Sequence, residues 1–260
     1  MTVRTVKKPV TESAPIISIS GLTKSFANTD YYVLENVNLS IQRGEFFILL
    51  GPSGCGKSTL LNIVSGFIEK SAGEMSVDEE EVHKPGRNRG VVFQQADAAL
   101  FPWLTVKENV EFGLKMKKVP KNTREQASAH YINVVGLQGH EGKFPRELSG
   151  GMKQRVQLAR VLANDPDILL MDEPFGALDA MTRRTMQTEL VRIWKETNKT
   201  VIFVTHDIQE ALLLGQKVGV MSVGPSSNIE TIYDISLPYP RSFSDKEFSL
   251  LYHKVQSHFD

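Results

Sequence analysis

A glycine-rich segment of eight residues restricts the folds open to this chain more strongly than any other stretch of it. The segment reads Gly51-Pro52-Ser53-Gly54-Cys55-Gly56-Lys57-Ser58 and fits the phosphate-loop pattern G-x-x-x-x-G-K-[ST] in full. An uninterrupted apolar run at residues 46–50 precedes it, as expected for a strand buried on both faces, and a helical apolar pattern follows at residues 59–67. The order strand, glycine loop and helix predicts a nucleotide-binding loop on an α/β sheet.

The chemistry expected of this loop follows from its residue types. Glycines let the main chain wrap closely around a polyphosphate, and the helix that starts near Lys57 adds its positive N-terminal end. We expect Lys57 to bridge the β- and γ-phosphates and the Ser58 hydroxyl to bind Mg²⁺. The remaining residues expected to bind the nucleotide are Gly51, Pro52, Ser53, Gly54, Cys55, Gly56 and Thr59.

Two adjacent carboxylates, Asp172 and Glu173, follow a second buried-strand pattern at residues 168–171. Ligands of open α/β sheets gather at the carboxyl ends of the strands. Asp172 suits the coordination shell of Mg²⁺, and Glu173 would act as general base toward the attacking water. An acidic pair after a strand is commonly just a solvated turn; the phosphate loop in the same chain favours the catalytic interpretation.

The rest of the chain reads as an interrupted α/β pattern. Alternating apolar residues at 16–41 predict half-exposed antiparallel strands, and apolar runs at 90–93 and 200–204 predict two further buried strands. A helical pattern fills residues 105–163. Because Lys57 and Asp172 are about 115 residues apart, far more than one βαβ crossover needs, this helical stretch is predicted to be an insertion. A last helix is expected at residues 245–256.

Composition removes several classes of protein. The 260 residues include 30 Lys and Arg against 30 Asp and Glu, so the charge excess of a typical nucleic-acid-binding protein is missing. One cysteine cannot form an internal disulfide. No apolar run approaches the roughly 18 residues of a membrane-spanning helix, and the polar first residues do not resemble a signal peptide. We therefore expect a soluble, intracellular α/β protein.

A third motif stands inside the helical stretch and reads Leu148-Ser149-Gly150-Gly151-Met152-Lys153-Gln154-Arg155. A serine hydroxyl and two glycine N–H groups at a helix N-terminus form an anion site. Together with the phosphate loop and the carboxylate pair, in this order, the motif resembles the signature of the ATP-binding-cassette (ABC) ATPases. The resemblance implies that Ser149, Gly150 and Gly151 bind the γ-phosphate of an ATP held by another subunit. Met152 stands where many members have Gln. This difference leaves the anion site of Ser149 and the two glycines unchanged.

Other landmarks of that family match residue by residue. Gln94 looks like the glutamine that senses Mg²⁺ and the attacking water, and His206, after the strand pattern, looks like the histidine that contacts the γ-phosphate. Gly176-Ala177-Leu178-Asp179 resembles the loop that crosses the dimer interface and adds Asp179 to the nucleotide site. Phe26 lies where the family stacks an aromatic ring on adenine, although Tyr31 or Tyr32 could do the stacking and a core role for Phe26 is equally open.

The resemblance covers nearly the whole chain and implies a RecA-like phosphate-loop core with an N-terminal antiparallel β subdomain and an inserted α-helical subdomain. The corresponding domain prediction is a flexible tail at 1–15, a nucleotide-binding domain at 16–240 with its helical insertion at about 97–163, and a C-terminal helical tail at 241–260. The segments 100–103, 152–155 and 172–179 resemble most the bacterial importers of the nitrate, sulfonate, taurine and bicarbonate group.

What the resemblance implies is an ATPase that uses ATP and Mg²⁺ and closes head-to-tail with a second copy, or with a similar ATPase, around two nucleotides. Integral-membrane permease subunits and, indirectly, a substrate-binding protein would be its partners, at the cytoplasmic face of the inner membrane. No nucleic acid is expected. The alternative is a non-transport ABC ATPase of the repair or translation type. A GTPase is disfavoured because Asn198-Lys199-Thr200 is not followed by the Asp of a guanine-reading motif.

Two further expectations concern single side chains. Leu100, Phe101 and Trp103 are expected at the contact with the membrane-spanning partner, the alternative being a small satellite core. Cys55, the single thiol, lies close to a helix N-terminus that could lower its pKa. We therefore expect alkylation of Cys55 to block ATP binding, and ATP to protect the thiol.

Overall fold

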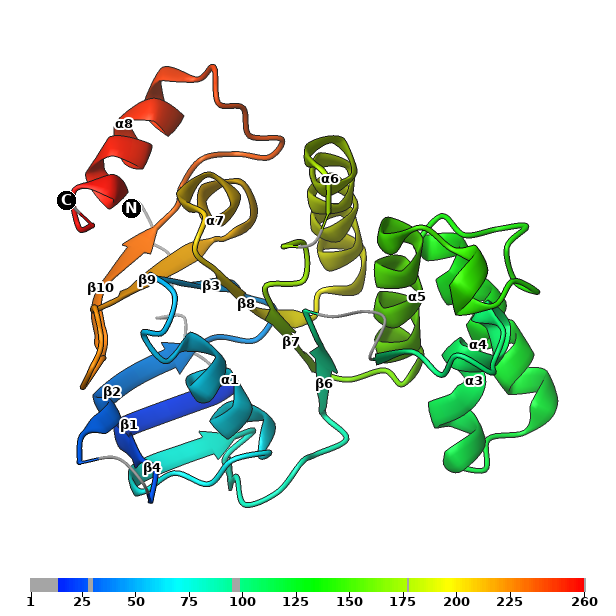
Figure 1. Cartoon of the computed structure of the whole chain (residues 1–260), viewed down its shortest axis with the longest axis horizontal. Helices are drawn as coiled ribbons and strands as arrows, with labels where there is room; N and C mark the ends of the chain where they lie inside the picture. Colours follow the sequence, from blue (N-terminus) through cyan, green and yellow to red (C-terminus); the bar gives the residue numbers. More distant parts are fainter. Residues whose placement is uncertain (1–13, 28–29, 95–98, 177, 260) are drawn as a thin grey trace, which may run out of the picture.

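A six-stranded sheet with the order β10-β9-β3-β8-β7-β6 lies at the centre of the computed structural model, which describes residues 14–27, 30–94, 99–176 and 178–259 (Figure 1). Its strands are β3 (Phe46–Leu50), β6 (Arg89–Val92), β7 (Ile168–Asp172), β8 (Thr200–Thr205), β9 (Lys217–Met221) and β10 (Ile229–Asp234). β3 pairs in parallel with β8 and β9, β7 pairs in parallel with β6 and β8, and β10 joins the edge antiparallel to β9. The predicted strands are therefore confirmed, but β6 lies at the edge of the sheet and buries only Val92, so the expectation that it is a buried strand is wrong.

A second sheet, with the order β2-β1-β4-β5, is antiparallel throughout. It consists of β1 (Ile17–Ser25), β2 (Tyr32–Ile41), β4 (Ala72–Val77) and β5 (Glu80–Glu81). The first two strands are the predicted alternating segments, and β4 is a strand that the sequence pattern did not reveal. Its glycine and glutamate are unfavourable in strands, and two residues, Met75 and Val77, carry its buried face.

Alternate residues of β3 bury in two separate cores, which explains why all five are apolar. Phe46, Ile48 and Leu50 face the core that contains the larger helices, whereas Phe47 and Leu49 face the core shared with the antiparallel sheet. A strand with helices on one face and a second sheet on the other has no solvent side. The central position of β3 thus fixes where its carboxyl end, and the phosphate loop after it, lies.

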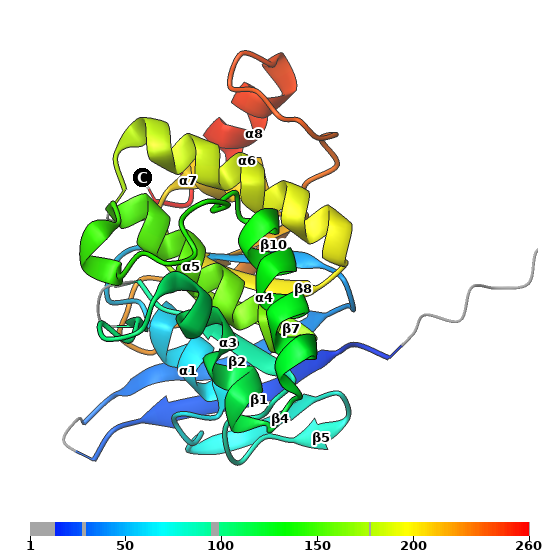
Figure 2. The same cartoon turned by 90° about the vertical axis from the view of Figure 1, so that its right-hand side faces the viewer.

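The predicted helical insertion is confirmed as a separate group at one end of the molecule (Figures 1 and 2). It contains α3 (Val106–Met116), α4 (Lys121–Val134), the short 3-10 turn η1 (Pro145–Glu147) and α5 (Gly150–Ala163). Thr105 and Glu108 form a capping box at the start of α3, in which the Glu108 main-chain N–H donates to the Thr105 hydroxyl. The expected start of the insertion, at about residue 97, lies outside the described residues.

The remaining helices flank the two sheets. α1 (Lys57–Ser65) follows the phosphate loop, and α6 (Ala180–Thr197), α7 (Ile208–Leu214) and α8 (Lys246–Gln256) complete the chain. One face of α6, with Met186, Leu190, Ile193 and Trp194, is apolar and buried, and the last helix lies where it was expected. Among the described residues no helix is both long and apolar enough to cross a bilayer.

Hydrogen bonds from Arg241 hold the segment between β10 and α8 against the end of α7. Its guanidinium donates to the main-chain oxygens of Leu212 and Gly215 at 2.6 Å each, and to those of Leu237 and Ile235. The carbonyls at a helix C-terminus have no partner within the helix, and a cation suits them. The first residues of the predicted N-terminal tail lie outside the described part, and the domain boundary at residue 240 stays a prediction.

Candidate functional site

Three neighbouring strands of the central sheet end at the same edge and carry the residues singled out from the sequence. β3 leads into the phosphate loop, β8 ends before His206, and β7 ends at Asp172. Because the carboxyl ends of parallel strands meet at one edge, residues from positions about 50, 172 and 206 come together there.

The phosphate loop has the main-chain shape that its glycines predict. Gly54 and Gly56 have φ values of 84° and 94°, in the left-handed region, and a Cβ atom on Gly56 would lie 2.7 Å from Leu34. Gly56 is the N-cap of α1 and supplies no side-chain acceptor to the first turn. The first N–H groups of α1 therefore point into the loop with no capping side chain, as an anion site requires.

The ammonium group of Lys57 lies inside the loop that it belongs to. Its Nζ donates to the main-chain oxygens of Gly51 and Pro52, at 2.8 Å each, and the side chain is only 4 % exposed. A buried cation held by neutral carbonyls places a positive charge at the point where phosphate oxygens would arrive. That Lys57 bridges the β- and γ-phosphates stays a prediction.

Ser58 and Asp172 meet although they are far apart in sequence. The Ser58 hydroxyl donates to Asp172 Oδ1 at 2.9 Å. Burial is the main reason why the pKa of Asp172 is raised, with Glu173 adding to the effect, whereas Ser58 and Lys57 act in the opposite direction. Mg²⁺ prefers a few oxygen ligands supplemented by water and phosphate, so a hydroxyl and a carboxylate in contact fit it. No group of three His, Cys, Asp or Glu suited to a metal occurs among the described residues.

Glu173 and His206, two residues predicted separately to act in catalysis, are in contact, with 3.2 Å between Glu173 Oε1 and His206 Nδ1. Glu173 has a φ of 42°, and its main chain is fixed by hydrogen bonds to Val204 and Gly176. A non-glycine residue in this region is strained, and such strain recurs at functional sites. The turn directs the Glu173 carboxylate to the sheet edge.

One cavity of about 360 Å³ unites these groups. Its lining combines loop residues with both carboxylates and with Gln94, which follows β6: Ser53, Gly54, Gly56, Lys57, Ser58, Thr59, Gln94, Asp172 and Glu173, together with Val33. Gly176 lies beside the same place, because a Cβ on it would be 3.6 Å from Gln94 Nε2. The cavity thus brings together many of the predicted site residues, whereas His206, Gly51, Pro52 and Cys55 do not line it.

The three aromatic candidates for adenine stacking are placed differently. Tyr31 lines an adjoining cavity of about 460 Å³ together with Ser53 and Gly54. Phe26 is 39 % exposed and has a lysine ammonium 4.8 Å from its ring centre. Neither Phe26 nor Tyr32 lines the phosphate cavity or the adjoining cavity. Tyr31 is thus the one of the three that lines a cavity beside the phosphate loop, and which ring stacks on adenine stays a prediction.

Ser149 and Asp179 both begin helices, away from the cavity that contains Lys57. Ser149 caps α5 and accepts a hydrogen bond from the Met152 N–H at 3.4 Å, and Asp179 caps α6 by accepting from Met181 and Thr182. Gly151 lies against α6, where a Cβ would be 2.5 Å from Thr182. Neither Ser149 nor Asp179 lines the phosphate cavity of its own chain. Ala177, within the segment 176–179 that is predicted to cross the dimer interface, lies outside the described residues.

Gln157 is a residue that the sequence reasoning missed. It is fully buried on α5, and in the amide orientation that satisfies both groups it accepts from the Phe93 N–H at 2.6 Å and donates to the Phe93 carbonyl at 3.1 Å. These hydrogen bonds link α5, the helix that begins within the 148–155 motif, to Phe93, the residue before Gln94. The available signal was a polar residue on the apolar face of a predicted helix.

The expectation that the helix N-terminus lowers the pKa of Cys55 is wrong, whereas the effect of alkylation on ATP binding stays a prediction. The thiol is 1 % exposed, and burial raises its pKa, which outweighs the opposite effect of Lys57. We expect a soluble maleimide to modify Cys55 in the folded chain at least about 100-fold more slowly than in the urea-unfolded chain, because the thiolate is both rare and covered. Mass spectrometry over time measures this; rapid, stoichiometric labelling of the folded chain would contradict it.

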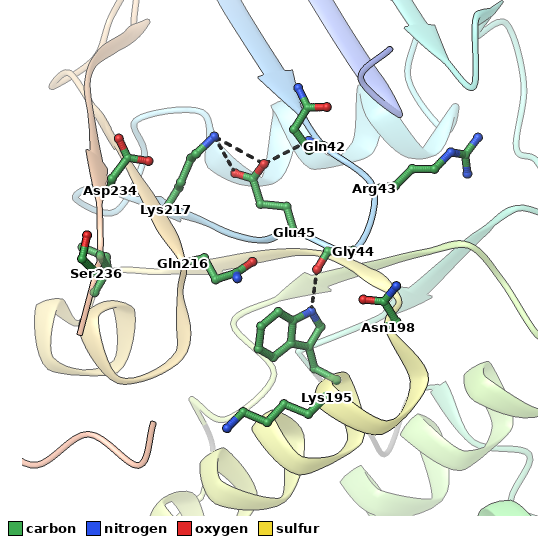
Figure 3. Close-up of a pocket in the computed structure, with 12 residues that line it drawn as sticks. Gln42, Arg43, Gly44, Glu45, Lys195, Asn198, Gln216, Lys217, Asp234 and Ser236 are labelled. Atoms are coloured by element: carbon green, nitrogen blue, oxygen red, sulfur yellow. Dashed lines mark hydrogen bonds and ion pairs between the residues drawn. The ribbon is translucent and has the colours of Figure 1, made fainter. Parts of the chain in front are cut away.

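A further hollow lies at the opposite, amino-terminal end of β3, β8 and β9. Its volume is about 680 Å³, and Figure 3 shows Lys217 reaching toward Glu45, with 3.3 Å between Lys217 Nζ and Glu45 Oε1. The same Glu45 carboxylate accepts from the Gln42 N–H, and the Trp194 indole donates to the Gly44 carbonyl at 2.9 Å. None of the predicted site residues lines it.

Comparisons with known proteins agree with this geometry. A family model described as "ABC transporter" matches residues 34–176. The taurine import ATP-binding protein TauB of Roseobacter denitrificans is 50 % identical over 80 % of this chain and 78 % of its own length. The aliphatic sulfonates import ATP-binding protein SsuB of Bacillus cereus is 44 % identical over 94 % of this chain and 96 % of its own. A dimeric structure of the cassette MJ0796, bound to ADP and Pi, superposes with a TM-score of 0.74 at 33 % identity, covering 85 % of this chain and 100 % of that one.

Proposed function

Because this chain belongs to the ABC transporter family, as an ATP-binding ATPase of the transport type, we propose that it drives the import of a small anion of the taurine, sulfonate, nitrate or bicarbonate class. The observation that carries the site assignment is the convergence of Lys57, Ser58, Gln94, Asp172 and Glu173 around one cavity at the ends of β3, β6 and β7. The non-transport alternative is disfavoured by the importer relatives.

In the proposed reaction, ATP and water give ADP and phosphate. The side chains and main-chain N–H groups of this chain hold the nucleotide and orient and deprotonate the attacking water. Lys57 and the N–H groups of α1 bind the phosphates, and Tyr31 stacks on adenine. Ser58, Asp172 and Gln94 hold Mg²⁺, which supplies positive charge against the γ-phosphate. Glu173 accepts a proton from the attacking water. His206, 3.2 Å from Glu173, orients that carboxylate and contacts the γ-phosphate.

A complete site needs a second subunit, since Ser149, Gly150 and Gly151 lie apart from the phosphate cavity of their own chain. We propose that two copies, or this chain and a similar ATPase, close head-to-tail so that each Ser149 faces the other's ATP. Asp179, at the start of α6, lies at the same interface.

The oligomer prediction is tested by the dependence of turnover on protein concentration. At low concentration the ATPase rate is expected to rise with the square of the protein concentration and then become linear as dimers saturate. A phosphate-release assay over a hundredfold dilution series measures this. A strictly linear rate across the series, with no dimer in sedimentation, would overturn the two-subunit site.

The proposed contact with membrane-spanning permease subunits centres on Trp103. Leu100 is buried, and Phe101 is half-buried with its ring centre 4.3 Å from that of Phe112, so both belong to the packing of the helical subdomain. Trp103 is 70 % exposed although tryptophan is costly to leave in water. The three residues therefore differ: Leu100 is buried, Phe101 is half-buried, and Trp103 is exposed and is the residue that we propose docks on the permease.

Trp103→Ala is expected to abolish co-purification with the permease while the free energy of unfolding changes by less than about 0.5 kcal/mol and soluble ATPase activity is kept. Phe101→Ala is the matched comparison, expected to cost about 1–3 kcal/mol because it removes buried ring contacts. Pull-down and urea titration measure both. Loss of folding in Trp103→Ala would favour the satellite-core interpretation.

We place the ATPase at the cytoplasmic face of the inner membrane, attached through the permease, with cargo delivered by a substrate-binding protein on the other side. The anion class is supported by the names of the relatives, which are import ATP-binding proteins for taurine and aliphatic sulfonates. The balanced charge of the chain supports the expectation that no nucleic acid is involved.

A further inference from the structure

A cavity of about 440 Å³ lies outside the proposed nucleotide site, where α6 and the end of α7 meet the segment between β10 and α8. One face of α6 forms its wall, from Arg184 through Val191 to Lys195. The opposite side comes from Tyr239 and Phe243. Its volume falls within the range typical of small-molecule sites.

The charges around this cavity have one sign. Arg184, Arg192, Lys195 and Arg241 line it, and no acidic residue does. Arg192 forms ion pairs with Glu189 and Glu196, at 2.9 and 2.8 Å. The guanidinium of Arg241 donates its hydrogen bonds to main-chain oxygens.

Arg184 and Lys195 remain available to an anion. Within the described part of the chain they form no side-chain hydrogen bond or ion pair, and their cations lie over aromatic rings of the same cavity, Lys195 at 4.7 Å from Tyr239 and Arg184 at 5.7 Å from Phe243. A cation over a ring stays free to meet an anion with its other donors.

The floor of the cavity is apolar, formed by Val191, Leu213, Leu214 and Pro240 beside the two rings. Arg184 and Lys195 are eleven positions apart on α6, or about 16 Å at 1.5 Å per residue. The space between them is therefore long, apolar and bordered by positive charge at both ends.

We propose that this cavity binds an organic anion with an apolar tail, such as an alkyl sulfonate, with the anionic head on Lys195 or Arg184 and the tail on the apolar floor.

A buried chain of hydrogen bonds runs from the cavity wall to the residue before His206. Gln187, in the wall, donates to Glu210 at 2.9 Å, and Thr205 donates to the other Glu210 oxygen at 2.6 Å. All three side chains are buried, so the bonds are poorly screened. A ligand that shifts α6 would displace this chain, and through it His206. This second step rests on the proposed role of His206, whereas binding itself does not.

The binding step is tested without nucleotide, on the full chain carrying Trp103→Phe. Trp194, with its ring centre 5.8 Å from that of Tyr239, is then the single tryptophan and reports on the cavity. Octane-1-sulfonate is expected to change its fluorescence saturably, and calorimetry to give the same Kd. Octan-1-ol, which lacks the charge, and taurine, which lacks the tail, are each expected to bind at least tenfold more weakly.

Arg184→Gln combined with Lys195→Gln should weaken octane-1-sulfonate binding at least tenfold. Lys121→Gln, which removes an exposed lysine at the start of α4, is the control and should not weaken binding. Equal binding of octan-1-ol and octane-1-sulfonate, or unchanged binding in the double variant, would overturn the proposal.

The coupling step is measured as ATP turnover with and without saturating octane-1-sulfonate. The ligand is expected to change kcat with little change in KM for ATP, and the double variant should keep its basal turnover but lose the response. Saturable binding with no change in kcat would overturn the link to His206 while leaving the binding site intact.

Discussion

Glu173→Gln is expected to lower ATP turnover by about 10²- to 10⁴-fold while ATP binding is retained. The amide has the shape of the carboxylate but cannot accept a proton from water at neutral pH. The turn at Glu173 is held by main-chain bonds to Val204 and Gly176, which the substitution leaves in place. We therefore expect the fold to be unchanged and the ATP-bound dimer, which hydrolysis would normally open, to accumulate.

Size-exclusion chromatography with and without ATP, together with a phosphate-release assay, measures both effects of Glu173→Gln. Glu74→Gln, an exposed carboxylate on β4, is the matched control and should behave as the unmodified chain. Turnover within a factor of a few of the unmodified chain would remove Glu173 from the role of general base. Loss of ATP binding would point instead to a part in holding the nucleotide.

Ser149→Asp is expected to reduce turnover at least about 100-fold without destabilising the chain. Aspartate is as good an N-cap as serine, so α5 keeps the acceptor for the Met152 N–H. Across the proposed interface, however, its charge would meet the γ-phosphate, and two unit charges 4 Å apart repel by about 4 kcal/mol at an effective dielectric constant of 20. The dimer with ATP should therefore not close.

Ser149→Asn separates capping from charge, because asparagine also caps but is neutral. We expect it to lose no more than about tenfold in turnover and to dimerise with ATP. Urea titration of both variants, run beside the ATPase assay, checks that α5 is intact. Equal turnover in the Asp and Asn variants would show that no anion reaches Ser149.

The parts of the site that depend on local chemistry could be predicted from the sequence. The phosphate loop and the carboxylate pair are each a short run with its own strand, and parallel strands bring their carboxyl ends together whatever lies between them. The contact between Ser58 and Asp172 follows directly from this rule. The helical insertion was equally visible, because its apolar spacing persists over some sixty residues.

The features that escaped prediction depend on long-range packing. Cys55 lies near a helix N-terminus, which suggested a reactive thiol, but how deeply it is buried is decided by side chains from other elements. β4 has two inward-facing apolar residues and is a strand because β1 lies beside it. The position of Tyr31 beside the phosphate loop and the bonds of Gln157 to Phe93 likewise depend on segments distant in sequence.

The place of β3 in the sheet has a consequence for how the chain is made. Both partners of this strand, β8 and β9, come roughly 150 residues later in the sequence. At a synthesis rate of about 5–20 residues per second, a ribosome needs roughly 8–30 s to deliver them. During that time five consecutive apolar residues have no strand partners, which makes the nascent chain prone to aggregation. The phosphate loop is thus among the first functional segments to be synthesised and among the last to take its shape.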